Sequence, residues 1–104
     1  MYIYKKEKMT IGKVYKITSK HNPNISYIGS TIQPLNVRLS KHKHDYKRYS
    51  KGKHNYVTSY EVIKLGDCKI DLIKEVTFDK RSELRKIEAG YVKTDQTCVN
   101  KIYS

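Results

Sequence analysis

Apolar and polar residues alternate along parts of the chain in the way that strands require. The alternation is clearest over 13–17 and 69–76, and 25–29 is similarly rich in residues that favour β-structure. A period of two predicts strands with one buried face. Because residues 20–24 (Lys-His-Asn-Pro-Asn) have the composition of a turn, we expect the first two strands to form a hairpin that ends at Gly29.

The residues after this hairpin follow a helical period instead. Their apolar and aromatic positions recur every three to four residues, at Leu35, Leu39, His42 and Tyr46. Pro34 suits the first turn of this helix, and Thr31 or Gln33 is the expected cap. Residues 47–55 are polar and charged and include a glycine, so we expect a loop there.

Two more helices are expected in the second half of the chain. Residues 57–65 predict a short helix that Gly66 ends. Asp79 is the expected cap of the last helix, whose apolar face consists of Leu84, Ile87, Tyr91 and Val92. A short segment around 99–102 closes the chain. The resulting order, β-β-α-α-β-α, predicts an α+β fold.

The charge balance points to the kind of partner. The 104 residues suffice for one domain, and 22 lysines and arginines face only 10 aspartates and glutamates, a formal net charge of +12. Such a charge opposes compaction unless a polyanion is the partner. Nucleic acid is the commonest partner of this kind, and an anionic membrane surface is the second. The helix after the hairpin has too few large apolar anchors for membrane binding, so we expect no membrane partner.

Several features of the chain favour an intracellular location. Residues 1–10 form a basic N-terminal extension without the apolar core of a secretory signal, and no apolar run approaches the roughly 20 residues that span a bilayer. Cys68 and Cys98 lack the spacing of a cysteine zinc site and are expected to be reduced thiols. We therefore expect a soluble protein of the cytoplasm or nucleus.

Five polar side chains stand beside apolar positions and are candidates for chemistry. Tyr15 and Tyr27 occupy alternation positions in the predicted hairpin and can share a face, although strands favour tyrosine for packing alone. Arg38 and His42 project side by side from the first helix, either as a functional pair or as part of an exposed basic helix. Glu88 lies in the apolar stripe of the last helix, where burial requires a cation, either a divalent metal or an arginine.

These residues, in this order, resemble the motifs of the GIY-YIG nuclease superfamily. That superfamily includes phage homing endonucleases, some restriction enzymes and the bacterial excision-repair nuclease domain. Its first motif corresponds to 12–17 (Gly-Lys-Val-Tyr-Lys-Ile), where Lys-Val replaces Gly-Ile before the tyrosine, and its second to 27–31 (Tyr-Ile-Gly-Ser-Thr). The family's helix arginine falls on Arg38, with His42 in the spacing of the homing-endonuclease branch. The resemblance extends from residue 12 to about residue 102.

The remaining family positions also have counterparts here. The branch's loop histidine falls on His54, the metal-binding glutamate on Glu88 and the C-terminal asparagine on Asn100. The resemblance implies a single nuclease domain over 1–104, with a small three-stranded antiparallel sheet flanked by helices. It implies an endonuclease that hydrolyses phosphodiester bonds of DNA with the help of one Mg²⁺ or Mn²⁺ ion, held by Glu88, and without a small-molecule cofactor.

The resemblance also implies roles for individual side chains. The catalytic residues would be Tyr15, Tyr27, Arg38, His42 and Glu88, and DNA contacts are expected at Gly29, Ser30, Lys41, His54 and Asn100. Arg38 would donate charge-assisted hydrogen bonds to the phosphate. Either Tyr15 or Tyr27 would accept the proton of the attacking water, provided that Arg38 and the metal lower a tyrosine pKa that is normally near ~10. His42 would orient or relay the proton.

One alternative keeps the fold and changes the function. A non-catalytic nucleic-acid-binding module would keep the basic surface, but it has no need for a buried carboxylate such as Glu88. We expect low intrinsic sequence specificity, because no DNA-reading motif follows the domain. The resemblance leaves room for an additional DNA-targeting domain or protein and for a viral or phage origin.

Overall fold

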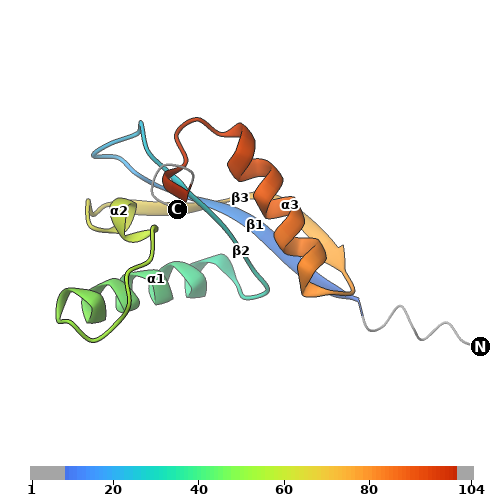
Figure 1. The fold of residues 1–104 in the computed structure, drawn as a ribbon, viewed down its shortest axis with the longest axis horizontal. Coiled ribbons are helices and arrows are strands. Elements are labelled where there is room, and N and C mark those ends of the chain that lie inside the picture. Colours follow the sequence, from blue (N-terminus) through green and yellow to red (C-terminus); the bar gives the residue numbers. More distant parts are fainter. Residues whose placement is uncertain (1–8, 101–104) are drawn as a thin grey trace, which may run out of the picture.

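The computed structural model describes residues 9–100 and shows the predicted order of elements. The elements are β1 (Thr10–Ser19), β2 (Tyr27–Thr31), α1 (Leu35–Ser50), α2 (Tyr60–Ile63), β3 (Cys68–Phe78) and α3 (Arg81–Thr94) (Figure 1). The strands form an antiparallel three-stranded sheet in the order β2-β1-β3. The predicted α+β fold with a small antiparallel sheet flanked by helices is therefore confirmed. None of the helices in the described range is long and apolar enough to span a bilayer.

The strands are longer than the alternation predicted, and the prediction that Gly29 ends the second strand is wrong. Gly29 pairs with Tyr15, and β2 continues through Ser30 to Thr31. The glycine is needed here for space, since a Cβ atom at position 29 would lie 2.6 Å from Cζ of Tyr15. The ring of Tyr15 therefore lies across the β2 backbone.

The expected loop over 47–55 is also wrong at its beginning, because α1 continues to Ser50. The last turns of α1 are held by aromatic packing, with the rings of Tyr46 and Tyr49 lying 5.5 and 5.0 Å from that of Tyr60. Only Tyr60–Ile63 of the expected helix 57–65 is helical, with single turns on either side. Gly66 follows this element with φ of +79°, as a terminating glycine should.

The expected helix caps differ from those observed. Thr31 Oγ1 accepts a hydrogen bond from the backbone N–H of Gln33 at 3.0 Å, which closes a turn, and Pro34 holds the cap position. At α3 the cap position is Lys80 instead of Asp79. The Glu83 carboxylate accepts from both backbone N–H groups there, at 2.8 and 3.1 Å. The first turn of α3 is thus capped from inside the helix.

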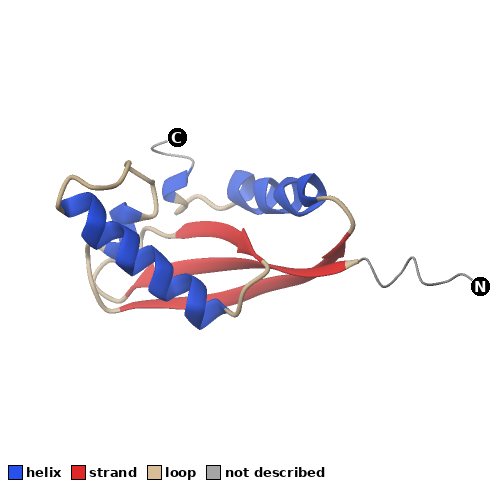
Figure 2. Cartoon of the chain, turned by 90° about the horizontal axis from the view of Figure 1, so that it is seen from below, coloured by secondary structure: helices blue, strands red, loops and turns tan. Residues whose placement is uncertain are grey.

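The sheet separates two small cores, with α3 on one side and α1 and α2 on the other (Figures 1 and 2). The core under α3 contains the buried residues Val14, Ile28, Phe78, Leu84 and Cys98. The core under α1 and α2 contains Tyr15, Ile17, Val62, Ile63 and Val99. Gly12 lets α3 come close to β1, because a Cβ atom there would lie 2.8 Å from the Leu84 side chain. Alternation along β1 therefore decides which side chains face which helix.

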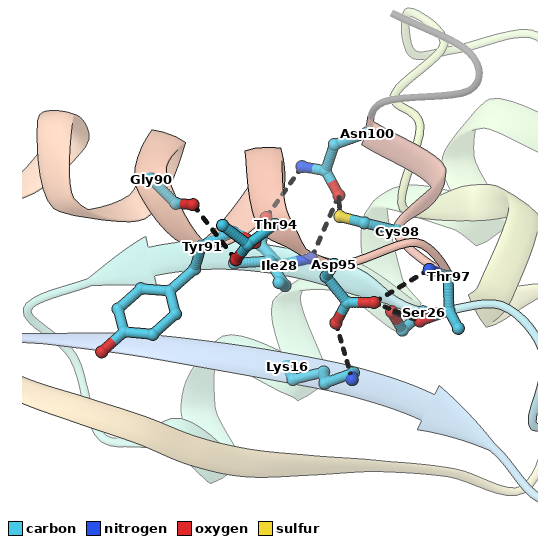
Figure 3. Close-up of polar contacts among 10 residues, drawn as sticks. All are labelled: Lys16, Ser26, Ile28, Gly90, Tyr91, Thr94, Asp95, Thr97, Cys98 and Asn100. Carbon is cyan, nitrogen blue, oxygen red and sulfur yellow. Dashed lines mark hydrogen bonds and ion pairs between the residues drawn. The ribbon is translucent and has the colours of Figure 1, made fainter.

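The chain after α3 returns to the outer edge of β2 (Figure 3). The backbone of Ser26 donates to Thr97 at 2.8 Å and accepts from Val99 at 2.7 Å. The side-chain amide of Asn100 bonds both backbone groups of Ile28, at 3.0 and 2.8 Å. Residues 97–100 thus act as a short edge for β2, and residues 101–102 of the expected closing segment lie outside the described residues.

Candidate active site

A hollow of about 340 Å³ opens beside the end of β2, between α1 and α3. Its lining side chains come from β1, β2, α1 and α3, and they are Tyr15, Tyr27, Ser30, Arg38, Arg81, Arg85 and Glu88. The structure therefore brings together the two tyrosines, the arginine and the glutamate that the sequence singled out. Arginine, tyrosine and carboxylate groups in one hollow can bind an anion, exchange a proton and hold a cation.

The hairpin places the two tyrosines side by side. In the register of β1 and β2, Tyr15 pairs with Gly29 and Ile17 pairs with Tyr27, so both tyrosines lie on the α1 side of the sheet. Their ring centroids are 6.4 Å apart. The prediction that they share a face is confirmed.

A chain of hydrogen bonds connects the hydroxyl of Tyr15 to the interior. The Tyr15 hydroxyl lies 2.8 Å from Nε2 of His42, and Nδ1 of His42 lies 3.0 Å from the hydroxyl of Ser59. Nε of Arg38 donates to the Tyr15 oxygen at 3.2 Å. His42 and Ser59 are buried and Arg38 is half-buried. Arg38 and His42 are thus a pair directed at Tyr15, which argues against the reading of both as members of an exposed basic helix.

Burial dominates the electrostatics of these groups. It raises the pKa of the Tyr15 hydroxyl, and the nearby Arg38 guanidinium lowers that pKa by less than burial raises it. Burial also raises the pKa of Tyr27. Burial first, and the charge of Arg38 second, lower the pKa of His42 to about 4. At neutral pH both tyrosines are therefore protonated and His42 is neutral. Arg38 does lower the pKa of Tyr15, as expected, but by too little to offset the effect of burial.

Glu88 enters the hollow from α3 and is oriented by β2. The hydroxyl of Ser30 donates to Oε1 of Glu88 at 2.5 Å. Within residues 9–100, Glu88 forms no ion pair, so the arginine partner allowed by the sequence is not observed. No group of three or more histidine, cysteine, aspartate or glutamate side chains that could hold a metal occurs among the described residues. One half-buried carboxylate with a free oxygen still fits a hydrated Mg²⁺, which takes one or two carboxylates and completes its shell with water and substrate phosphate.

Two residues of the hollow, Arg81 and Arg85, were not among the predicted site residues. They precede Glu88 by seven and three residues on α3, so all three lie on one helical face. That spacing was visible in the sequence, but arginines do not stand out in a chain with 22 basic residues. With Arg38 they give the hollow three guanidinium groups against one carboxylate. The hollow therefore attracts anions more strongly than cations.

Three predicted DNA-contact residues lie outside the hollow. Lys41 pairs with Asp45 on α1 at 3.4 Å, and His54 lies 3.0 Å from the Tyr60 hydroxyl. The amide of Asn100 is bonded to β2 as described above. Of the other two predicted contacts, Ser30 lines the hollow and orients Glu88, and Gly29 precedes it on β2 and makes room for Tyr15. Contact of any of these five residues with DNA stays a prediction.

Comparison with known proteins agrees with this geometry. The GIY-YIG catalytic domain family matches residues 11–102. Searches among curated proteins and among solved structures returned no match. Members of this family are typically endonucleases, nucleic acid is the corresponding substrate class, and a divalent metal is generally used. The match spans most of the chain and all elements of the sheet, and the chain belongs to the GIY-YIG family.

Proposed function

We propose that this protein is a divalent-metal-dependent endonuclease that cuts the DNA backbone with low intrinsic sequence specificity. The observation that carries this proposal is the convergence of Tyr15, Tyr27, Arg38 and Glu88, from four separate elements, on one hollow. These three residue types can bind a phosphate, move a proton and hold a cation. Phosphodiester hydrolysis requires all three operations.

Substrate binding is assigned to the arginines. A guanidinium group donates two parallel hydrogen bonds to a phosphate and keeps its charge at all working pH values. Arg38 is the arginine best held for this role, since its Nε is already bonded to Tyr15 at 3.2 Å. The net charge of +12 adds binding that does not depend on sequence. This supports low specificity.

Glu88 is the residue that would hold Mg²⁺ or Mn²⁺. When bound, the ion supplies positive charge to the scissile phosphate and the leaving oxygen. Ser30 occupies one carboxylate oxygen and leaves the other available. Because three arginines surround a single carboxylate, the hollow itself binds a cation weakly, and phosphate oxygens from DNA are needed to complete the shell.

Proton transfer is assigned to Tyr15 and His42. Neutral His42 with its proton on Nδ1 donates to Ser59 and leaves Nε2 free to accept from the Tyr15 hydroxyl. As an attacking water gives its proton to the Tyr15 oxygen, the Tyr15 proton moves to Nε2 of His42. This relay spares Tyr15 a full negative charge; because the pKa of His42 is about 4, the imidazolium that forms is a strong acid and passes its proton on. The relay also supports Tyr15 over Tyr27, whose hydroxyl has no hydrogen-bond partner among the described residues.

A plasmid-nicking assay tests the proposal. Supercoiled plasmid is incubated with the protein with and without Mg²⁺, alongside Glu88→Gln and the control Glu75→Gln, which removes the same charge from an exposed position of β3. We expect Mg²⁺-dependent nicking by the wild type and Glu75→Gln, and none by Glu88→Gln, with DNA binding retained by all three. A wild-type protein that binds DNA and never nicks it would favour the non-catalytic binding module.

A further inference from the structure

A second hollow adjoins the first on the side of the loop between β2 and α1. Its volume is about 300 Å³, and it is lined by Ser30, Thr31, Ile32, Gln33, Arg38 and Arg81. Ser30, Arg38 and Arg81 line both hollows. The two hollows are therefore neighbours along one surface, with Ser30 and the two arginines at their junction.

The junction carries two guanidinium groups, because Arg38 and Arg81 line both hollows. Arg81 and Arg38 form no ion pair with any carboxylate of the described range, although Glu88 lines the same hollow. Two unneutralised guanidinium groups at one junction favour an anion on either side of it.

A phosphate bound in the first hollow determines which part of the DNA strand reaches the second hollow. If the scissile phosphate lies between Arg38 and Glu88, the same DNA strand must leave that hollow, and its next phosphate follows within one nucleotide. The loop side offers a guanidinium from Arg81 and a side-chain amide from Gln33, both of which donate hydrogen bonds to phosphate oxygens. On the opposite side, beyond Tyr27, residues 97–100 lie along the outer edge of the chain at Ser26 and Ile28.

We propose that the second hollow is a subsite for the backbone phosphate adjoining the scissile phosphate, and that Arg81 binds it. This inference rests on the proposed nuclease function and adds a direction to it, because the strand then runs from Glu88 over the loop 30–33. Arg81 contacts a phosphate that does not react. It is a positioning residue, and its loss acts on DNA binding more than on the chemical step.

The test is a thermodynamic cycle that combines one change in the protein, Arg81→Gln, with one change in the DNA, a phosphate made neutral. Short duplexes with mapped cut positions carry a single methylphosphonate one phosphate away from a mapped cut, on either side. Lys86→Gln is the control, since it removes one positive charge from an exposed position of the same helix. The rate of cutting at the mapped bond is measured at subsaturating DNA, and the unfolding temperature of each variant confirms its fold.

We expect neutralising one of the two adjoining phosphates to slow wild-type cutting about tenfold, the worth of one charge-assisted hydrogen bond. Arg81→Gln should be about tenfold slower on natural DNA through a raised KM, and it should lose nothing further on that modified duplex. Lys86→Gln should keep the full sensitivity of the wild type. The proposed subsite is wrong if Arg81→Gln and the methylphosphonate each slow cutting by their full factor when they are combined, whichever side of the cut carries the methylphosphonate. A wild-type protein that cuts no duplex overturns the proposed function itself, so the two failures are distinguishable.

Discussion

Two tyrosine–histidine pairs lie beside α1, and only one belongs to the candidate active site. Tyr15 and His42 are 2.8 Å apart and buried. Tyr60 and His54 are 3.0 Å apart, with the histidine half-buried in the loop that follows α1. The two pairs have the same chemistry, so the residue types alone do not make a site.

The surroundings of the two pairs account for the difference. The rings of Tyr46, Tyr49 and Tyr56 surround Tyr60, with centroids 5.0 to 6.0 Å away. Tyr15 instead lies over a glycine, accepts a hydrogen bond from Arg38 and borders a hollow that also contains Glu88. A tyrosine–histidine pair becomes chemically useful where the backbone leaves room for substrate and where opposite charges converge. Around Tyr60 the same space is filled by aromatic packing.

The largest effect should come from removing one hydroxyl from each pair. Tyr15→Phe keeps the ring and removes the group that bonds His42 and Arg38, so we expect nicking to fall by roughly 10² to 10⁴, the usual contribution of a general base. Tyr60→Phe removes the matching hydroxyl from the other pair and should change nicking less than about threefold, with only the loss of one hydrogen bond. Initial rates of plasmid nicking measure both. Equal losses of nicking in the two variants would show that the Tyr15–His42 pair is no more important for activity than the Tyr60–His54 pair.

The stability of the folded protein should fall in acid because His42 is buried. Its pKa in the folded protein is about 4, below its ordinary value of 6.5, so the unfolded chain takes up a proton first as the pH falls. Stability is therefore lost between pH 6.5 and about 4, by on the order of 3 kcal/mol, and this loss levels off below that range.

Urea unfolding at pH 7 and pH 4.5 measures this dependence. His42→Gln should lose much less stability than the wild type between pH 7 and pH 4.5. His44→Gln, at an exposed position of α1, should lose as much as the wild type. Parallel pH profiles for the wild type and His42→Gln would mean that the histidine titrates as it does in water.

The glycine under Tyr15 gives a third test. In Gly29→Ala the new methyl group would lie 2.6 Å from Cζ of Tyr15, so the ring must shift. We expect a loss of about 1 to 3 kcal/mol of stability from overpacking, together with reduced nicking. Gly90→Ala is the matched control on α3, where an added Cβ atom would meet no side chain within 4 Å, and it should stabilise by roughly 0.5 to 1 kcal/mol. Thermal unfolding of the two variants should therefore shift in opposite directions.

Local patterns predicted the elements and missed their ends. Alternation identified 13–17, but β1 pairs on both sides, and this pairing extends regular backbone over Thr10–Ser19 beyond the residues that alternate. The loop expected at 47–55 begins with residues that can be helical, and they are helical here because Tyr46 and Tyr49 pack on Tyr60, which lies further along the chain. Contacts of this kind are absent from any local window of sequence.

The site was predictable to the extent that its residues stand out from their neighbours. Glu88 stood out as a carboxylate in an apolar stripe, and it does line the hollow. Arg81 and Arg85 did not, because the chain is basic throughout. The bonds from Ser30 to Glu88 and from Asn100 to Ile28 join residues 58 and 72 positions apart, so only the path of the folded chain reveals them.

The smallest effect is expected at the Ser30 hydroxyl, which distinguishes orienting Glu88 from binding the ion. Ser30→Ala removes the donor to Oε1 of Glu88 and leaves the carboxylate charge in place. A hydrogen bond to a charged group contributes about 1.5 to 3 kcal/mol, and water can replace part of it in this open hollow, so we expect a loss of tenfold or less.

The loss should appear as a higher Mg²⁺ concentration at half-maximal nicking rate, with little change at saturating Mg²⁺, because a less ordered carboxylate weakens binding and leaves the chemistry intact. Ser30→Thr keeps the hydroxyl and should restore most of the effect, and Ser40→Ala, at an exposed position of α1, should have none. If Ser30→Ala instead lowers the maximal rate and leaves the Mg²⁺ titration unchanged, the hydroxyl acts on the substrate, as predicted for a DNA-contact residue. Either outcome separates the two roles, since only orientation of Glu88 couples Ser30 to the metal.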